Sequence, residues 1–380
     1  MLAAVLLAVA TAVVFYFLIG YPILLAVSRR AAPPVHKDPA FRPTLSILVA
    51  VHNGEEFLSR KLDSLLALDY PANLREILVI SDGSTDSTEA IAGSFASRGV
   101  RLLSVPRGGK AAALNAGLAQ ASGDILFFTD VRQMLDAQAL AHLAANFADP
   151  SVGAVTGELR LLNPASTGEQ ADMELYWRFE IWARSCHSRI DSIFSTTGCI
   201  YALRRSLASP LPPDTIADDG TFSLRAFFRG YRVIFDPEAL AFDYPAAEGG
   251  EFRRRLRTLA GLWQIFVRLP QLFTSANRMR FHFLSYKFGR LLLPWAILLI
   301  LGSTLALTDS RWRNFLLVDE LMLVALAALD RFVPRAFFLK RVSSPARTFV
   351  AMNAAALLSL LVFFVPPKAL WRPTRMQARQ

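Results

Sequence analysis

The distribution of apolar and polar residues divides the chain into two apolar ends and a mixed middle. Residues 1–27 carry no charged side chain and are long enough to cross a hydrocarbon core of about 30 Å. This run is too long for the apolar part of a secretory signal, and no basic residues precede it, so we expect a retained membrane anchor. Further apolar stretches near the other end predict more spans: residues 288–307, 349–365, and 315–329, the last interrupted by Asp319 and Glu320.

Between these ends, short apolar runs alternate with segments of helical periodicity. The runs are typical of strands buried on both faces, and amphipathic segments separate them. This βαβ order predicts an α/β fold with a doubly wound, mostly parallel sheet, in which ligands bind at the carboxyl ends of the strands. The expected strands are residues 45–51, 77–80, 101–105 and 124–129; the expected helices end at residue 68 or cover 87–96 and 109–120.

Composition agrees with a mixed architecture. Hydrophobic residues make up 53% of the chain, which is high for a soluble protein and low for one that lies in the membrane throughout. We therefore expect the following order of parts: a transmembrane helix at 1–27, a linker at 28–41, a cytosolic α/β domain at 42–249, a basic interfacial helical segment at 250–285, about three transmembrane helices at 286–366, and a basic tail at 367–380.

Basic residues beside the spans predict the orientation of the chain. Arg29 and Arg30 follow the first span, which by the positive-inside rule places the α/β domain in the cytoplasm. Three C-terminal spans then leave the basic tail outside, against the same rule. We expect three spans nevertheless, because a basic cluster after the middle stretch then lies inside; its members are Arg331, Arg335, Lys340 and Arg341.

Charge and cysteine content narrow the partners and the compartment. The chain has 41 Lys and Arg against 31 Asp and Glu, and the excess is concentrated in residues 250–290. Such a localised patch suits anionic lipid, a phosphate-bearing substrate, or both. The two cysteines, Cys186 and Cys199, form no metal-ligand spacing and no disulfide framework, which fits a reducing cytosol.

Polar residues fall where the predicted strands end. His52 and Asn53 follow the first strand, Asp82 the second, and Asp130 the last, while Lys110 begins a helix. A lysine at a helix start can meet phosphate together with the unpaired backbone N–H groups. The alternatives are an Asx turn for Asp82 and a solvated surface side chain for Lys110.

An acidic pair, Asp218 and Asp219, precedes a predicted helix at 221–228 and a strand at 231–235. Adjacent carboxylates at such a place are candidates for a general base. The alternative is that they cap the helix, because an acidic residue there satisfies backbone N–H groups and opposes the helix dipole.

Several ordered motifs together resemble the membrane-bound family 2 glycosyltransferases, which include cellulose, hyaluronan and poly-N-acetylglucosamine synthases. The resemblance implies a GT-A type fold and inverting transfer from a UDP-sugar to a polysaccharide or lipid-linked acceptor at a bacterial-type inner membrane. It implies membrane lipids as further partners and no nucleic acid. The residues that carry it are 45–56, 79–88, 108–117, 128–130, 217–219 and 230–233.

The resemblance also assigns roles on the donor side. Asp82 would accept from the uracil ring, His52 would stack on the base, and Lys110 would meet the diphosphate. Asn53 and Glu55 belong to the same nucleotide-sugar group. Asp130 matches the first acid of the family's Asp-x-Asp motif, which holds Mg²⁺ or Mn²⁺, but Arg132 stands where the second acid is expected. Either Asp130 holds the cation with phosphate and water, or Arg132 neutralises the diphosphate; we favour the metal.

On the acceptor side, Asp219 matches the family's catalytic base, with Asp218 beside it, and Gly198 lies in the segment that flanks the acceptor. Arg254 and Arg257 correspond to the family's Gln-x-x-Arg-Trp motif, although its Gln and Trp are absent. These weakened motifs leave a second interpretation, a catalytically inactive subunit of this fold that scaffolds a polysaccharide secretion complex. A pure transporter is disfavoured because too few spans are expected.

Overall fold

The computed structural model describes residues 1–28, 31–162, 169–244, 250–308, 310–334 and 337–365, with side chains from 176 in the third range and from 252 in the fourth. The chain forms two compact units. The sheet unit comprises Arg30–Leu162 and His187–Tyr244, and the helical unit comprises Met1–Arg29, Asn163–Cys186 and Pro245–Gln380. The basic tail and the Arg29–Arg30 pair, on which the predicted orientation depends, lie outside the described residues.

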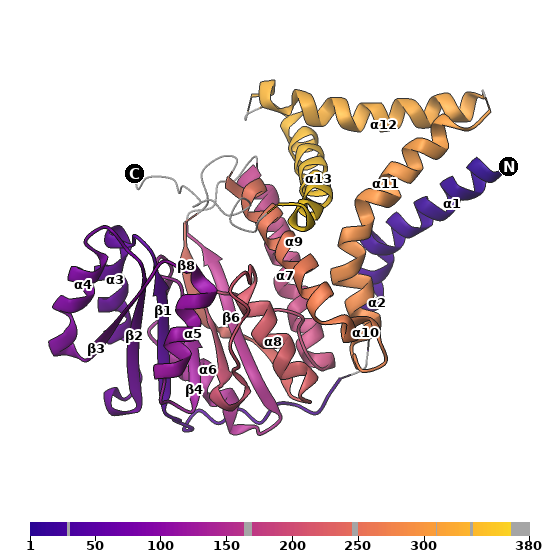
Figure 1. Cartoon of the computed structure of the whole chain (residues 1–380). Helices are drawn as coiled ribbons and strands as arrows, with labels where there is room; N and C mark the ends of the chain where they lie inside the picture. The colour runs from indigo at the N-terminus through magenta and orange to yellow at the C-terminus, as the bar shows by residue number, and fades with distance from the viewer. Residues whose placement is uncertain (29–30, 163–168, 245–249, 309, 335–336, 366–380) are drawn as a thin grey trace. The chain divides into compact units, whose positions relative to one another are not determined.

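An eight-stranded sheet forms the centre of the sheet unit, with the strand order β3-β2-β1-β4-β7-β6-β8-β5 (Figure 1). Strands β1 to β4 run parallel, and β7 enters antiparallel between β4 and β6. The strands are β1 (Leu45–Val51), β2 (Arg75–Asp82), β3 (Val100–Val105), β4 (Ile125–Phe128), β5 (Met134–Leu135), β6 (Val152–Leu161), β7 (Tyr201–Arg204) and β8 (Arg232–Asp243).

Both faces of the sheet are covered because its strands are apolar on both sides. Ile47 and Val49 of β1 face a core shared with α3 (Glu55–Leu66), α4 (Thr88–Ser94) and α6 (Ala139–Ala145). The opposite face, to which Leu48 belongs, carries α5 (Lys110–Gln120) and α8 (Asp218–Phe228). The doubly wound sheet and the four strands expected from the apolar runs are confirmed.

Helix α8 begins at Asp218, so the predicted start at 221 is wrong. The N-cap residue is Ala217, which makes no side-chain cap hydrogen bond. Asp218 and Asp219 therefore lie in the first helical turn, where negative charge is favourable against the helix dipole. The acidic pair thus belongs to the first turn of α8, and the helix fixes the backbone of both residues.

The helical unit contains three helices that are long and apolar enough to cross a membrane, counted over the described residues: Leu2–Val27, Arg280–Leu305 and Lys340–Phe363. The first comprises α1 (Leu2–Phe15), η1 (Tyr16–Gly20) and α2 (Tyr21–Val27), and α1 packs beside α11 (Gly289–Leu305) (Figure 1). The others include α10 (Arg280–Phe283), η7 (Leu284–Phe288), α13 (Lys340–Leu358) and η9 (Ser359–Phe363).

The stretch predicted as a third C-terminal span forms α12 (Arg311–Leu329), which has no buried residue. Its apolar sequence is interrupted by Arg313, Asp319 and Glu320, so it does not meet the composition of a span. Glu320 Oε1 accepts a hydrogen bond of 2.8 Å from Thr304 of α11, which gives one oxygen of this carboxyl group a partner on a neighbouring helix. Whether α12 spans the membrane stays a prediction.

Three helices carry a buried polar network within the helical unit. Tyr176 and Glu180 lie on α7 (Glu169–Ile190), which ends in the sheet unit, and Tyr176 donates to Glu180 Oε1 at 2.7 Å. Arg290 of α11 pairs with Glu180, and Arg255 of α9 (Gly250–Arg268) donates to the Tyr176 hydroxyl at 2.9 Å. Tyr176 and Glu180 thus join α7 to α9 and α11 within the helical unit.

Gly123 marks a close approach between the start of β4 and the backbone of β1. A Cβ atom there would lie 2.6 Å from the carbonyl carbon of Leu45 and from Ser46 N, and neither backbone atom can rotate away. We expect Gly123→Ala to destabilise the sheet unit by about 1–3 kcal/mol. The thermal unfolding midpoint of the purified protein in detergent measures this.

Gly93→Ala is the matched control, because nothing lies within 4 Å of a Cβ atom at that helical position. This variant should melt at or slightly above the midpoint of the parent, since alanine is the better helix former. Equal melting midpoints for the two variants would contradict the prediction, because they would show that the backbone of β1 can move away from a methyl group at position 123.

Candidate functional site

The carboxyl ends of β1, β2 and β4 bring the predicted donor-side residues to one edge of the sheet. Asp82 is the last residue of β2 and pairs with Val105, the last residue of β3. Phe128 ends β4 opposite Leu48, so Asp130 emerges beside the end of β1. Parallel strands thus gather these polar residues at one rim, as the fold class predicts.

Asp82 is buried, and its carboxylate is saturated by the loop that leads into α5. Its Oδ1 accepts from the backbone N–H groups of Gly108 at 2.7 Å and Gly109 at 3.0 Å. Its Oδ2 accepts from Gly109 at 3.0 Å and from the Arg107 guanidinium. Three donor groups, one of them shared between the two oxygens, thus hold the carboxylate, so Asp82 orders this loop and forms no Asx turn.

The loops after β1 and β2 brace each other. His52 Nδ1 donates to the Asp82 carbonyl at 2.9 Å, and the Asn53 side chain accepts from Thr85 N at 2.8 Å. Glu55 accepts from Ser87 N at 3.0 Å, at the start of α4. Burial, followed by the Arg107 charge, lowers the pKa of His52. The structure therefore gives Asn53 and Glu55 bracing contacts at the rim.

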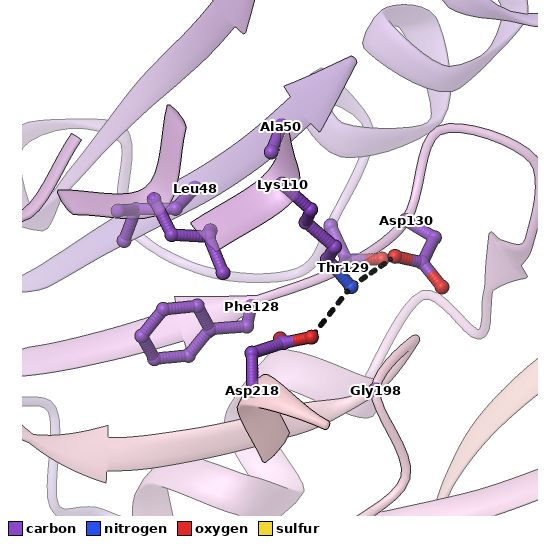
Figure 2. A pocket seen from close by; sticks show the side chains of 9 residues that line it. Leu48, Ala50, Lys110, Phe128, Thr129, Asp130, Gly198 and Asp218 are labelled. Atoms are coloured by element: carbon purple, nitrogen blue, oxygen red, sulfur yellow. Dashed lines mark hydrogen bonds and ion pairs between the residues drawn. The ribbon is translucent and has the colours of Figure 1, made fainter. Parts of the chain in front are cut away.

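Lys110, the first residue of α5, reaches between two carboxylates (Figure 2). Its Nζ atom lies 2.9 Å from Asp130 Oδ1 and 3.4 Å from Asp218 Oδ1. Burial alone would lower the pKa of Lys110, but Asp130 and Asp218 raise it above its ordinary value. Burial would likewise raise the pKa of Asp130, and Lys110 holds it below its ordinary value. Lys110 and Asp130 are therefore both ionised at neutral pH.

Arg132 is turned into an ion pair with Asp243, the last residue of β8. The guanidinium donates through Nε at 3.1 Å and through Nη2 at 2.7 Å, and Gln133 Nε2 donates to the same carboxylate at 2.7 Å. Asp243 is 6% exposed, so this bidentate pair is largely shielded from water. Lys110, with its contact to Asp130, is thus the cation that faces the predicted metal ligand.

The two acids of α8 have different surroundings. Asp218 is buried, and the Tyr201 hydroxyl lies 3.5 Å from its Oδ2. Burial and then the charge of Asp218 raise the pKa of Tyr201 well above its ordinary value, so the phenol stays a donor. Asp219 is only partly buried, and its carbonyl accepts from Thr196 at 3.1 Å. Asp219 is therefore the more accessible acid.

Gly198 adjoins the cluster of Lys110 and the α8 acids. A Cβ atom built on it would be 3.6 Å from Asp219 Oδ2 and 3.8 Å from Lys110 Nζ. A narrow cavity with no room for a water molecule lies at this point, and Figure 2 shows the polar groups on one side of it and apolar side chains on the other. Its lining consists of Leu48, Ala50, Lys110, Leu114, Phe128, Thr129, Asp130, Gly198 and Asp218.

Comparisons with known proteins show which family the sheet unit resembles. The family model described as Glycosyl transferase family 2 matches residues 46–209, which contain most of the rim. The chain carries a family 2 glycosyltransferase domain. It is 27% identical over 254 residues to the probable glycosyltransferase YdaM of Bacillus subtilis (strain 168), with 63% of this chain and 60% of that relative covered.

Two further similarities extend beyond the matched domain. Poly-beta-1,6-N-acetyl-D-glucosamine synthase of Staphylococcus aureus (strain COL) is 25% identical over 310 residues, covering 76% of this chain and 74% of that protein. The structure of the mannosyltransferase PcManGT from Pyrobaculum calidifontis, in complex with GDP-Man and Mn²⁺, superposes with a TM-score of 0.72 at 24% identity, covering 94% and 98% of the two chains. The GT-A fold of this glycosyltransferase is confirmed.

The glycosyltransferase site offers few ligands for a cation. Within the described part of the chain, no group of three or more His, Cys, Asp or Glu side chains could hold a metal ion. Asp130 supplies carboxylate oxygens, which suit a hard cation, and its side chain is 39% exposed. The residues therefore fit a cation that completes its coordination with phosphate and water.

The remaining predicted residues of the glycosyltransferase, Arg254 and Arg257, lie on α9, which belongs to the helical unit, whereas the rim cluster belongs to the sheet unit. The Arg254 guanidinium stacks over Trp177, 5.2 Å from the ring centroid. Cation–π stacking of this kind accounts for the Arg254 position without a ligand. The acceptor role of both arginines stays a prediction.

Several residues at or near the rim are not predicted from the sequence. Arg107 adjoins the Gly108–Gly109–Lys110 motif and could have been inferred from that position. Lys61 lies on the apolar face of α3 together with Leu58, Leu62 and Leu65. A charged residue at such a position indicates a buried polar contact and could have been noticed in the sequence. Tyr201 and Asp243 gave no comparable signal in the sequence.

Because a methyl group at Gly198 meets only ordinary van der Waals contacts, Gly198→Ala should fold normally. The methyl group would nevertheless fill the space between Asp219 and Lys110, and we expect the kcat/KM for transfer to fall about tenfold or more. Steady-state kinetics beside a thermal melt measures this. Full activity with an unchanged melting midpoint would show that nothing binds against Gly198.

Proposed function

We propose that this glycosyltransferase is an inverting enzyme that transfers a sugar from a UDP-sugar to a glycan or lipid-linked acceptor at the membrane. The observation that carries the proposal is the convergence of Lys110, Asp130 and the α8 acids at one rim of the sheet. One positive and several negative groups there match the two needs of the reaction, a neutralised leaving group and a base.

The donor side is supported by Lys110 at the start of α5. An ammonium group beside the N-terminus of a helix favours the oxygens of a diphosphate. Asp130 would hold Mg²⁺ or Mn²⁺, and such a cation neutralises the charge that develops on the departing diphosphate. Lys110 faces the same space, and it contributes positive charge whether or not the cation is bound.

Asp219 is the acid best suited to act as the base. Its carboxylate faces the space at Gly198, whereas Asp218 is buried and is held by Lys110 and Tyr201. Inversion requires one base on the face of the sugar opposite the leaving group, so Asp219 takes the proton from the acceptor hydroxyl as that oxygen attacks the anomeric carbon. Asp218 keeps Lys110 in place.

The proposed acceptor and the proposed location are supported by the helical unit and by the relatives. Three helices of the described chain are apolar and long enough to cross a membrane. One relative is named a poly-beta-1,6-N-acetyl-D-glucosamine synthase, which makes an extracellular or cell-envelope glycan the favoured product class. We place the catalytic domain on the cytoplasmic side of an inner membrane, where nucleotide-sugars are made.

Asp219→Asn tests this function directly. The amide keeps the shape of the side chain but loses the proton acceptor, so UDP binding should persist while kcat falls by about 10²–10⁴-fold. The measurement is transfer of label in membranes supplied with a panel of labelled UDP-sugars, beside calorimetry with UDP. Asp214→Asn, which changes an exposed acid shortly before α8, is the control and should resemble the parent.

Two outcomes would contradict the proposal in different ways. Asp219→Asn with turnover within a few-fold of the parent would move the base elsewhere. A parent that transfers no sugar and releases no UDP from any donor would favour the inactive scaffolding subunit.

The cation is tested by removal and return. If Asp130 holds a metal with the diphosphate, EDTA should abolish transfer, and excess Mn²⁺ or Mg²⁺ should restore it. A chelator-free control with the same ionic strength accounts for screening of the Lys110 ion pairs. Full activity in EDTA would assign neutralisation of the diphosphate to Lys110, because Arg132 is already paired with Asp243.

A further inference from the structure

Lys61 is a buried basic residue that contacts the segment carrying Asp130. It lies on α3, where its side chain is 0% exposed among the apolar residues Leu58, Leu62 and Leu65. Burying a charged group is costly unless it is paired or hydrogen-bonded. Burial lowers the pKa of Lys61 to about 7, which reflects that cost.

The polar contacts of Lys61 all lead to one turn. Its Nζ atom donates to Thr129 Oγ1 at 2.7 Å and to the Gln133 carbonyl oxygen at 2.6 Å. These acceptors stand on either side of Asp130, in the turn between β4 and β5. A single ammonium group thus ties together the two ends of the segment that carries Asp130.

The same turn is held from the other side by Asp243. Arg132 and Gln133 both donate to this carboxylate at the end of β8. Internal contacts therefore engage the side chains of Thr129, Arg132 and Gln133 and the carbonyl oxygen of Gln133. The Asp130 side chain is left facing Lys110 and the cavity.

We propose that Lys61 is a positioning residue for transfer: by bridging Thr129 and Gln133, it fixes the turn that aims Asp130 at Lys110 and at the diphosphate of the donor. This inference rests on the proposed function. It makes Lys61 act through Asp130, since Lys61 is sealed from solvent and touches no substrate.

A structural role and a positioning role predict different results. If Lys61 served stability, an apolar side chain of similar length would do as well or better, because it avoids the cost of burying a charge. If Lys61 positions the turn, the apolar replacement leaves Thr129 and the Gln133 carbonyl without their shared donor, and Asp130 loses its fixed direction. Stability and donor binding should then separate.

The experiment compares Lys61→Met with Leu58→Met in the full-length protein in detergent. Leu58 is fully buried one turn earlier on the same helix, so its replacement controls for a change in the α3 core. Binding of UDP in the presence of Mn²⁺ is measured by calorimetry, with GDP used instead if the parent prefers it. The KM for the donor and the melting midpoint are measured on the same preparations.

We expect Lys61→Met to melt within a few degrees of the parent or higher, while nucleotide affinity falls tenfold or more and the donor KM rises in proportion. Leu58→Met should stay within about twofold of the parent. Affinity and kcat/KM of Lys61→Met within threefold of the parent would overturn the proposal and leave the proposed function intact. An inert parent that binds neither nucleotide would overturn both.

Thr129→Val decides the matter if Lys61→Met fails to fold. Valine keeps the shape of threonine but lacks the Oγ1 acceptor that Lys61 uses. A loss of nucleotide affinity of threefold or more in this variant supports the positioning role. Affinity equal to that of the parent, in a variant that melts normally, overturns it.

Discussion

The electrostatic balance around Lys110 is the constraint on which the rest of the site depends. Three carboxyl groups, those of Asp130, Asp218 and Asp219, gather near one point, and like charges at such distances disfavour ionisation of one another. The Lys110 ammonium offsets this repulsion through its contacts with Asp130 and Asp218. It can do so only if the turn after β4, the start of α5 and the start of α8 all keep their places. Each of these segments is in fact anchored by contacts beneath the rim.

The fold is largely predictable because its information is local. Continuous apolar runs reveal β1, β2 and β4, and the rule for parallel sheets places Asp82 and Asp130 at one edge from the order of the strands alone. The short β7 is not expected, since four residues carry too little pattern and its antiparallel place depends on neighbours far along the chain. The places of the predicted donor-side residues follow from the sequence as well, because those residues come directly after the predicted strands.

The supporting contacts are not predictable, because they join residues distant in sequence. Arg132 and Asp243 are separated by 111 positions, and Lys61 and Thr129 by 68. No periodicity records such pairs. The sequence also leaves two interpretations of Arg132, and only its contact with Asp243 shows where the guanidinium points. Motifs therefore reveal the residues at the rim, whereas the residues that hold the rim are recognisable only in the folded chain.

The saturation of Asp82 has a consequence for how a nucleotide would be recognised. A base that takes up a hydrogen bond with this carboxylate would compete with Arg107 and the loop N–H groups for its oxygens, so one partner is exchanged for another. The net gain is a difference between two hydrogen bonds to a charged group, each worth about 1.5–3 kcal/mol, so it is smaller than either of them. Discrimination among bases then depends on whether the displaced guanidinium finds a new acceptor on the base itself. Uracil and guanine both present carbonyl oxygens, so a guanidinium released from the acid would find an acceptor on either base.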